Sequence, residues 1–200
     1  MSSGRLLLAT NNKAKVREYR VLLEGIPYET VAPAEMGIIL DVDESGGTFE
    51  ENASLKAKAY ASTGDLLALA DDSGLEVDAL GGEPGVLSAR YAGEGASDRE
   101  RIEYLLSKLA DVPWERRGAR FRCAIAIASP NGEVTLCQGE CPGIIALEPR
   151  GTAGFGYDPV FYLPRLDKTM AQLSMEQKNE VSHRGKAARA ARNILMKRGL

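Results

Sequence analysis

The stretch Leu66-Leu67-Ala68-Leu69-Ala70-Asp71-Asp72-Ser73-Gly74 decides the fold class of this chain. Its first five residues form a continuous apolar run, which is typical of a strand that is buried on both faces of a sheet. We expect the strand to end where the polar residues begin. Two adjacent carboxylates repel each other, and burying them is unfavourable unless a cation or a proton compensates their charge. The other interpretation of the polar residues is an exposed turn of the Asp-Ser-Gly type.

Strand and helix signals alternate before this run. Residues 5–9 predict a strand, and a polar turn then leads into a helix whose apolar residues have helical spacing. Thr48 and Glu51 form a capping-box pattern, which predicts the start of a second helix. One face of that helix is apolar, and a different face carries Asn52 and Lys56.

The same kinds of signal follow the run. Ser97 and Glu100 mark the start of a helix that extends to about residue 110. Residues 120–128 and 134–137 flank Pro130-Asn131-Gly132, a pattern that predicts a hairpin. Because helix and strand signals interleave without a repeat or a linker, we predict a single α/β domain over residues 1–200 with a mostly buried sheet. Two helical stretches close the chain, at residues 168–179 and 183–198.

Composition excludes several classes of protein. The chain has 200 residues, of which 44% are hydrophobic and 26% are charged, as in an ordinary globular protein rather than a disordered or fibrous one. Its apolar runs are too short for a membrane span, and its first residues lack the apolar core of a secretory signal, so we expect a cytoplasmic protein. The net charge of -3 gives no basic field for general nucleic-acid binding. Three cysteines without a CxxC pair predict reduced, partly buried thiols.

Charge is spread unevenly along the chain. Residues 21–55 contain eight acidic side chains and no Lys or Arg, whereas residues 181–200 contain no acid. An acidic region that can hold a hard cation and a basic region that can hold its anionic ligand indicate metal-assisted work on a phosphate compound. Two solvated faces of opposite sign explain the same pattern.

The turn at Thr10-Asn11-Asn12-Lys13-Ala14-Lys15 lies between a predicted strand and a predicted helix. Free backbone N–H groups and the helix dipole favour an anion there, and two lysines add positive charge. The glycine-rich phosphate loop GxxxxGK[ST] is absent, so this turn would have to bind phosphate without it. A plain capped helix start is the alternative.

The acidic pair Asp71-Asp72 is the strongest candidate for a metal site. Mg²⁺ together with a phosphate substrate is a common way to compensate two carboxylates at the end of a buried strand. A second acidic segment, Asp41 to Gly46, has the oxygen positions of a calcium loop, but Asn52 stands where the bidentate Glu is needed.

The segment at residues 38–46 also resembles the strand-DxD motif of haloacid-dehalogenase-type phosphatases, with Asp41 as the nucleophile. The run before Asp72 imitates the later double-Asp motif of that family. Only about thirty residues separate the two motifs, which leaves little room for the intervening strands and helices of that fold.

Two segments of the second half combine groups that suit a nucleotide base. Residues 151–159, Gly-Thr-Ala-Gly-Phe-Gly-Tyr-Asp-Pro, place glycines beside an aromatic ring and a carboxylate, so that a base can stack on Phe155 and be read by Asp158. A structural glycine loop is the alternative. The only histidine, His183, stands beside Arg184, which can donate to a carbonyl or phosphate oxygen.

Five blocks in order carry a resemblance that covers most of the chain: LLLATNNKAK, TFEENASLKAKAYA, ALADDSGLEVDALGGEPGVLSARYAG, GTAGFGYDPVF and SHRGKA. Together they closely resemble the inosine triphosphate pyrophosphatase family. The resemblance implies an elongated mixed central sheet flanked by helices, with two lobes around a nucleotide-binding cleft, in a homodimer that has no nucleic-acid or membrane partner. It implies Mg²⁺-dependent hydrolysis of the triphosphates of inosine, deoxyinosine and xanthosine to the monophosphate and pyrophosphate, which prevents their incorporation into DNA and RNA.

The resemblance also implies roles for individual residues. Asp72 matches the proton acceptor of the family, and Glu44 and Asp72 match its metal positions. We add Asp71 as a further ligand or as an orienting group. Hydrogen-bond donors near Arg184 and an acceptor at Asp158 would suit O6 and N1–H of hypoxanthine and exclude adenine, which reverses both groups. The positions that match substrate contacts are Thr10, Asn11, Asn12, Lys13, Ala14, Lys15, Lys56, Ser73, Phe155, Gly156, Tyr157, Asp158, Lys178, His183 and Arg184.

Two other function classes stay open at this point. A phosphatase would form an aspartyl-phosphate at Asp41 and release orthophosphate. A non-catalytic nucleotide sensor would bind the same ligands without turnover, although a cluster of acids favours a working metal site.

Overall fold

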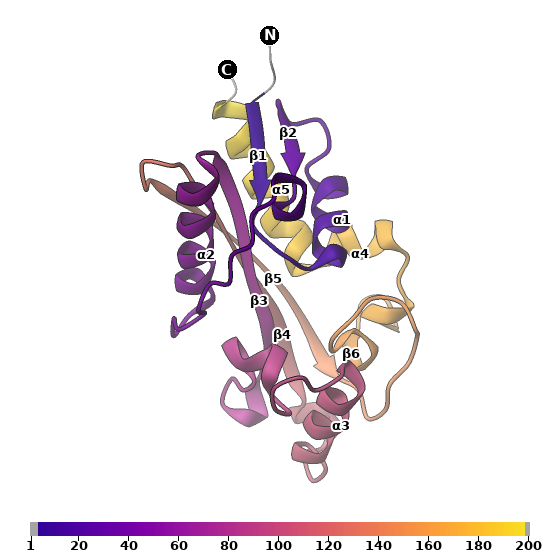
Figure 1. Cartoon of the computed structure of the whole chain (residues 1–200). Coiled ribbons are helices and arrows are strands. Elements are labelled where there is room, and N and C mark those ends of the chain that lie inside the picture. Colours follow the sequence, from indigo (N-terminus) through magenta and orange to yellow (C-terminus); the bar gives the residue numbers. More distant parts are fainter. Residues whose placement is uncertain (1–3, 199–200) are drawn as a thin grey trace. The chain divides into compact units, whose positions relative to one another are not determined.

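The computed structural model describes residues 4–198, and the chain divides into two compact units (Figure 1). Unit 1 comprises Met1–Asp72, Cys123–Gly139 and Arg184–Leu200. Unit 2 comprises Ser73–Arg122 and Glu140–His183. Each unit has its own hydrophobic core.

A mixed sheet of seven strands has the order β2-β1-β3-β4-β5-β6-β7. Strands β2 and β3 pair in parallel with β1, whereas β6 pairs antiparallel with β5 and β7. The predicted α/β class with a mixed sheet flanked by helices is therefore confirmed. The strands are β1 (Gly4–Leu8), β2 (Tyr28–Val31), β3 (Leu67–Val77), β4 (Gly118–Ala128), β5 (Val134–Ile145), β6 (Phe161–Leu163) and β7 (Lys168–Thr169).

Three helices cover the sheet of unit 1: α1 (Lys13–Leu22), α2 (Phe49–Gly64) and α5 (His183–Arg198). Leu6 and Leu8 of β1 share a core with residues of α1 and α5. Leu7 points to the other face, where a Cβ added at Gly64 of α2 would lie 3.1 Å from its Cδ2. Figure 1 shows α2 across β1 and β3 from α1 and α5. Because both faces are covered, the strand can be apolar on both sides.

Side-chain caps set the starts of the predicted helices. Thr48 accepts a hydrogen bond from the Glu51 N–H and caps α2, and Ser97 forms a reciprocal capping box with Glu100 at the start of α3 (Asp98–Lys108). Asn12 caps α1 by accepting from two backbone N–H groups of its first turn. The expected capping box is confirmed at α3, whereas at α2 only its Thr48 half forms and the Glu51 carboxylate accepts from the Gly47 N–H instead.

Strand β3 differs from its expected extent. It does not end at Ala70 but continues through Asp71 and Asp72 to Val77. In a strand, successive side chains point to opposite faces of the sheet. The two carboxylates therefore point away from each other, which lowers their repulsion and lets different cations neutralise each one.

The prediction that a helix starts at residue 168 is also wrong. Residues 168–172 form the short strand β7 and a single 3₁₀ turn, and α4 occupies only Met175–Val181. Thr169 is fully buried, and its hydroxyl donates to the Arg150 carbonyl, which holds this segment extended. Ser174 then caps α4 through a box with Gln177.

The helices and the three cysteines bear on the expectations about membrane spans and thiols. No helix within residues 4–198 has the length and apolar character needed to cross a membrane. Cys123, Cys137 and Cys141 are free thiols, as predicted, and all three are buried.

A buried arginine closes the end of α3 in unit 2. The Arg117 side chain donates to the carbonyls of Leu109 (2.6 Å), Val112 (2.9 Å) and Ala146 (3.4 Å). Arg117 is 4% exposed, and burial lowers the pKa of its guanidinium. A cation at a helix C-terminus satisfies carbonyls that have no partner within the helix.

Replacing Arg117 by Met should lower the free energy of unfolding by about 3 kcal/mol, because buried carbonyls lose charged donors. Urea denaturation measures this loss. Arg116→Met changes the neighbouring, exposed arginine and serves as the control. Equal stability of the two variants would contradict the role of Arg117.

Candidate functional site

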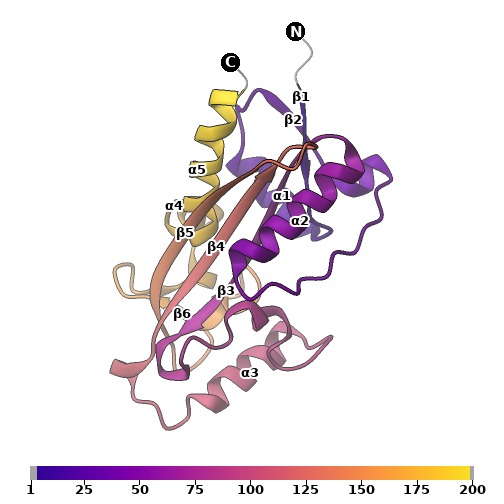
Figure 2. The same cartoon turned by 90° about the vertical axis from the view of Figure 1, so that its left-hand side faces the viewer.

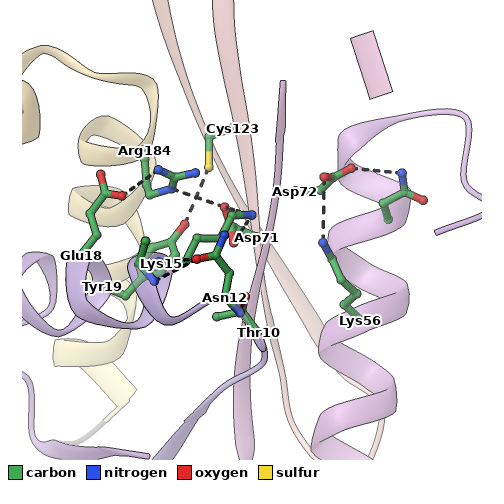
Figure 3. A network of polar contacts seen from close by, with 12 residues as sticks. Thr10, Asn12, Lys15, Glu18, Tyr19, Lys56, Asp71, Asp72, Cys123 and Arg184 are labelled. Carbon is green, nitrogen blue, oxygen red and sulfur yellow. Dashed lines mark hydrogen bonds and ion pairs between the residues drawn. The ribbon is translucent and has the colours of Figure 1, made fainter. Parts of the chain in front are cut away.

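Asp71 lies at the centre of a buried ion-pair network in unit 1 (Figure 3). Its carboxylate accepts from Lys15 Nζ at 3.0 Å and from Arg184 Nε at 3.4 Å. Burial alone would raise the pKa of Asp71, but Lys15 and Arg184 hold it well below its ordinary value. Arg184 is 2% exposed, and its Nη1 also donates to Glu18 of α1 at 2.8 Å. The Arg184 guanidinium is therefore paired with two carboxylates of unit 1, those of Glu18 and Asp71.

Asp72 points to the opposite face of β3, toward α2 (Figure 3). Asn52 Nδ2 donates to Asp72 Oδ2 at 3.0 Å, and Lys56 Nζ lies 3.9 Å from Asp72 Oδ1. Burial raises the pKa of Asp72 and nearby Glu44 adds to the rise, against the opposing effects of Lys56 and Asn52. A carboxylate with a raised pKa is a better proton acceptor near neutral pH than an ordinary aspartate.

Glu44 reaches the same place from the irregular segment before α2, visible in Figure 2. Lys56 Nζ donates to Glu44 Oε1 at 3.1 Å. Asn52 Oδ1 accepts from the Gly46 N–H at 2.8 Å, so one amide ties this segment to Asp72. A Cβ at Gly46 would lie 2.7 Å from Asn52 Oδ1, so the close approach requires glycine.

The carboxylates beside Lys56, those of Glu44 and Asp72, fit Mg²⁺ only if oxygens of the substrate complete the coordination. Across residues 4–198, no group of three His, Cys, Asp or Glu side chains is arranged to hold a metal ion. Glu44 and Asp72 supply two carboxylates, and Mg²⁺ commonly takes one or two carboxylates with waters and phosphate oxygens. Asp71 points away and is already paired with Lys15 and Arg184. The expected inclusion of Asp71 among the ligands therefore does not fit this geometry.

The predicted phosphate turn is a capped helix start in the structure. Asn12 Oδ1 accepts from the N–H groups of Ala14 (2.9 Å) and Lys15 (3.3 Å), and Thr10 Oγ1 accepts from the Asn12 N–H. Asn11 donates to the carbonyl of Leu40 at 3.4 Å. Lys13 is exposed, so its ammonium is accessible to an anion.

The alternative nucleophile Asp41 has no buried strand before it. Residues 38–46 have no regular secondary structure, and Ile39 is 100% exposed. Asp41 itself is exposed. The strand-DxD arrangement of haloacid-dehalogenase-type phosphatases is therefore not formed.

A second cluster, in unit 2, combines an aromatic ring with a carboxylate and an ammonium. Lys178 Nζ lies 2.6 Å from Asp158 Oδ2 and 4.8 Å from the centroid of the Phe155 ring. The same Asp158 oxygen accepts from the Phe155 N–H at 3.0 Å. Asp158 is 3% exposed whereas Phe155 is 37% exposed, so the ring stays accessible while the carboxylate holds the turn. Gly154 is required because a Cβ there would overlap the Asp158 carboxylate.

The other expected base contacts in unit 2 are largely buried. Tyr157 is 4% exposed, its hydroxyl donates to the Ser88 carbonyl, and burial raises its pKa to about 12. The His183 ring stacks on Phe121 with centroids 4.7 Å apart. Ser73 is half-buried in β3. Tyr157 and His183 thus pack against the interior of this unit.

Several residues of these clusters were not expected from the sequence. Asn52 had a detectable signal, since its i, i+4 spacing places it on the Lys56 face of α2. Glu18 had none, because an acid in an amphipathic helix ordinarily faces water. The structure brings Asp71, Lys15 and Arg184 together, and separately Asp72, Glu44 and Lys56.

Comparison with known proteins identifies the class. The fold is that of an open-sheet α/β protein, and solved structures match it over nearly its whole length. A HAM1 protein from Coxiella burnetii superposes with a TM-score of 0.89 at 42% identity, covering 96% of this chain and 98% of that one. The Staphylococcus aureus Ham1 protein gives a TM-score of 0.88 at 45% identity, covering 97% and 99%.

The chain belongs to the Ham1 family, whose model matches residues 6–194. The dITP/XTP pyrophosphatase of Desulforamulus reducens is 53% identical over 191 residues, which are 96% of this chain and 95% of that protein. The family resemblance read from the five sequence blocks is therefore confirmed.

Arg184→Met should lower the free energy of unfolding by about 3 kcal/mol, because Glu18 and Asp71 would lose a buried counter-ion. Thermal and urea denaturation measure the change. Lys197→Met, on the exposed surface of the same helix, is the control and should change stability by less than about 0.5 kcal/mol. An Arg184→Met protein as stable as this control would show that the network does not support unit 1.

Proposed function

We propose that this protein is a nucleoside triphosphate pyrophosphatase that acts on the triphosphates of inosine, deoxyinosine and xanthosine. It releases the monophosphate and pyrophosphate with Mg²⁺ and so keeps these purines out of DNA and RNA. The observation that carries the proposal is the buried Asp72, set between Asn52 and Lys56 beside Glu44, in a member of the Ham1 family. The similar dITP/XTP pyrophosphatases of Desulforamulus reducens and Bacillus subtilis support the substrate class.

The remaining parts of the proposal rest on the sequence resemblance. We propose that the protein works as a homodimer in the cytoplasm, without a nucleic-acid or membrane partner. Unit 1 carries the residues that we assign to the phosphates, and unit 2 carries those that we assign to the base.

Asp72 accepts the proton of the attacking water. Its raised pKa suits this role, and the Asn52 amide fixes the orientation of its carboxylate. Glu44 and Asp72 would hold Mg²⁺, which would stabilise negative charge on phosphate oxygens. Lys56 lies beside both acids and offers positive charge to the departing pyrophosphate.

In this proposal the turn at residues 10–15 binds phosphate through the positive charge of its lysines rather than through free backbone N–H groups, because Asn12 already accepts from the N–H groups of Ala14 and Lys15. Lys13 is exposed and can contact the phosphates directly. Lys15 adds positive charge from a position fixed by Asp71. Thr10, Asn11, Asn12 and Ala14 shape the turn through the hydrogen bonds of the helix start.

Base selection follows from the Lys178–Asp158 pair. An ammonium beside a carboxylate presents a donor next to an acceptor, which matches O6 and N1–H of hypoxanthine or xanthine. Adenine presents the reverse pattern, and such a mismatch leaves buried polar groups unpaired. The base stacks on the accessible ring of Phe155. The Arg184 guanidinium has no part in this selection, because Glu18 and Asp71 already hold it.

Incubation with inosine triphosphate and Mg²⁺ in ¹⁸O-labelled water tests the reaction. We expect inosine monophosphate and pyrophosphate, with the label in the monophosphate because water attacks the α-phosphorus. ATP and GTP should be hydrolysed far more slowly. Label in pyrophosphate would contradict α attack, and binding without any product would indicate a nucleotide sensor.

Asp41→Asn separates the phosphatase alternative from the proposal. We expect turnover within about twofold of the wild type, because Asp41 is exposed and lies outside the Asp72 cluster. Release of orthophosphate by the wild type, abolished in Asp41→Asn, would instead establish the aspartyl-phosphate route.

Lys178→Met should raise KM for inosine triphosphate about tenfold while kcat changes less, because the base loses a donor and Phe155 loses its cation. Steady-state kinetics measure both constants. Lys168→Met removes an exposed lysine of the same unit and should leave KM unchanged. A KM for Lys178→Met equal to that of this control would contradict the assignment.

A further inference from the structure

We propose that Asp98 is a positioning residue that fixes the backbone of residues 155–158, and with it the surface on which the purine base stacks. The inference rests on the proposed function, since it concerns the base-binding cluster of unit 2. Asp98 acts through the backbone of Gly156.

The carboxylate of Asp98 joins two segments that lie far apart in the sequence. Its Oδ2 accepts a hydrogen bond from the Gly156 N–H at 2.7 Å, across 58 positions of the chain. Its other oxygen, Oδ1, pairs with the Arg101 guanidinium one turn later in α3. Arg101 also donates to the carbonyl of Ala89, which holds its side chain in place. A charged acceptor makes the bond to Gly156 stronger than a neutral one would.

The helix itself does not need Asp98 as a cap. Ser97 Oγ accepts from the Glu100 N–H, and Glu100 Oε2 accepts from the Ser97 N–H. This reciprocal box already serves the start of α3. The Asp98 carboxylate is therefore available to bind another segment, and the structure directs one of its oxygens to Gly156.

Gly156 is the residue of this loop whose backbone N–H is held by a group outside the loop. Its φ of +61° lies in the left-handed region, and it separates the accessible Phe155 from the buried Tyr157. The Phe155 N–H is bound within the loop by Asp158, and the Tyr157 side chain is bound by Ser88. The bond to Asp98 fixes the peptide between these two anchors. Without it, rotation of that peptide would turn the Phe155 ring away from the Lys178 ammonium.

The matched variants Asp98→Ala, Asp98→Asn and Glu100→Ala test this role. Asp98→Ala removes the acceptor, whereas Asp98→Asn keeps an oxygen that can accept from Gly156. Glu100→Ala weakens the same helix start without touching the loop. We expect Asp98→Ala to raise KM for inosine triphosphate about tenfold with a smaller effect on kcat, Asp98→Asn to recover most of the loss, and Glu100→Ala to keep the wild-type KM.

Amide hydrogen exchange at Gly156, followed by NMR without substrate, reports on the contact directly. Asp98→Ala should speed exchange at Gly156, and Glu100→Ala should not. Unchanged exchange in Asp98→Ala, or a KM shift in Glu100→Ala as large as in Asp98→Ala, would overturn the inference. Faster exchange with an unchanged KM would overturn it as well. If the wild type hydrolyses no purine triphosphate, the proposed function fails, whereas the exchange measurement still decides whether Asp98 holds the loop.

Discussion

Two adjacent carboxylates in one buried strand are the constraint on which the rest of unit 1 depends. Because β3 continues through Asp71 and Asp72, their side chains lie on opposite faces of the sheet. Each negative charge therefore needs its own compensation. On one face Lys15 and Arg184 neutralise Asp71, and on the other Lys56 approaches Asp72. The helices that carry these cations are held in place by the same charges.

The two faces of β3 thus have different roles: the Asp71 network stabilises unit 1, and Asp72 is the residue that we assign to the reaction. On the Asp71 face, Arg184 and Glu18 are buried and paired with each other. A buried ion pair is stable only when both partners are present, so this face cannot lose one of its charges without a loss of stability. The Asp72 face is less completely compensated, since burial raises the pKa of Asp72 despite the nearby Lys56. A carboxylate in that state suits proton transfer and a cation supplied with the substrate. In unit 2, Asp158 likewise holds a loop while it keeps Lys178 over Phe155.

Much of this could be predicted from the sequence, and the failures have physical reasons. Apolar runs and capping boxes locate the strands and most helix starts because they depend on nearby residues. The expected end of β3 at Ala70 is too early in the chain. Polar residues ordinarily end a buried strand, and only cations from distant parts of the sequence stabilise Asp71 inside it. The commitment of Arg184 to Glu18 and the contact of Asp98 with Gly156 involve partners far apart in the chain, which no local pattern reveals.

The most direct test of this division compares Asp71→Asn with Asp72→Asn, measuring the free energy of unfolding and kcat for inosine triphosphate in each. Asp71→Asn should lose about 3 kcal/mol of stability, because Lys15 and Arg184 would keep their buried charge without its partner. Asp72→Asn should stay within about 1 kcal/mol of the wild type and lose about a hundredfold in kcat. An Asp72→Asn protein with near-normal turnover, or an Asp71→Asn protein with unchanged stability, would contradict the account.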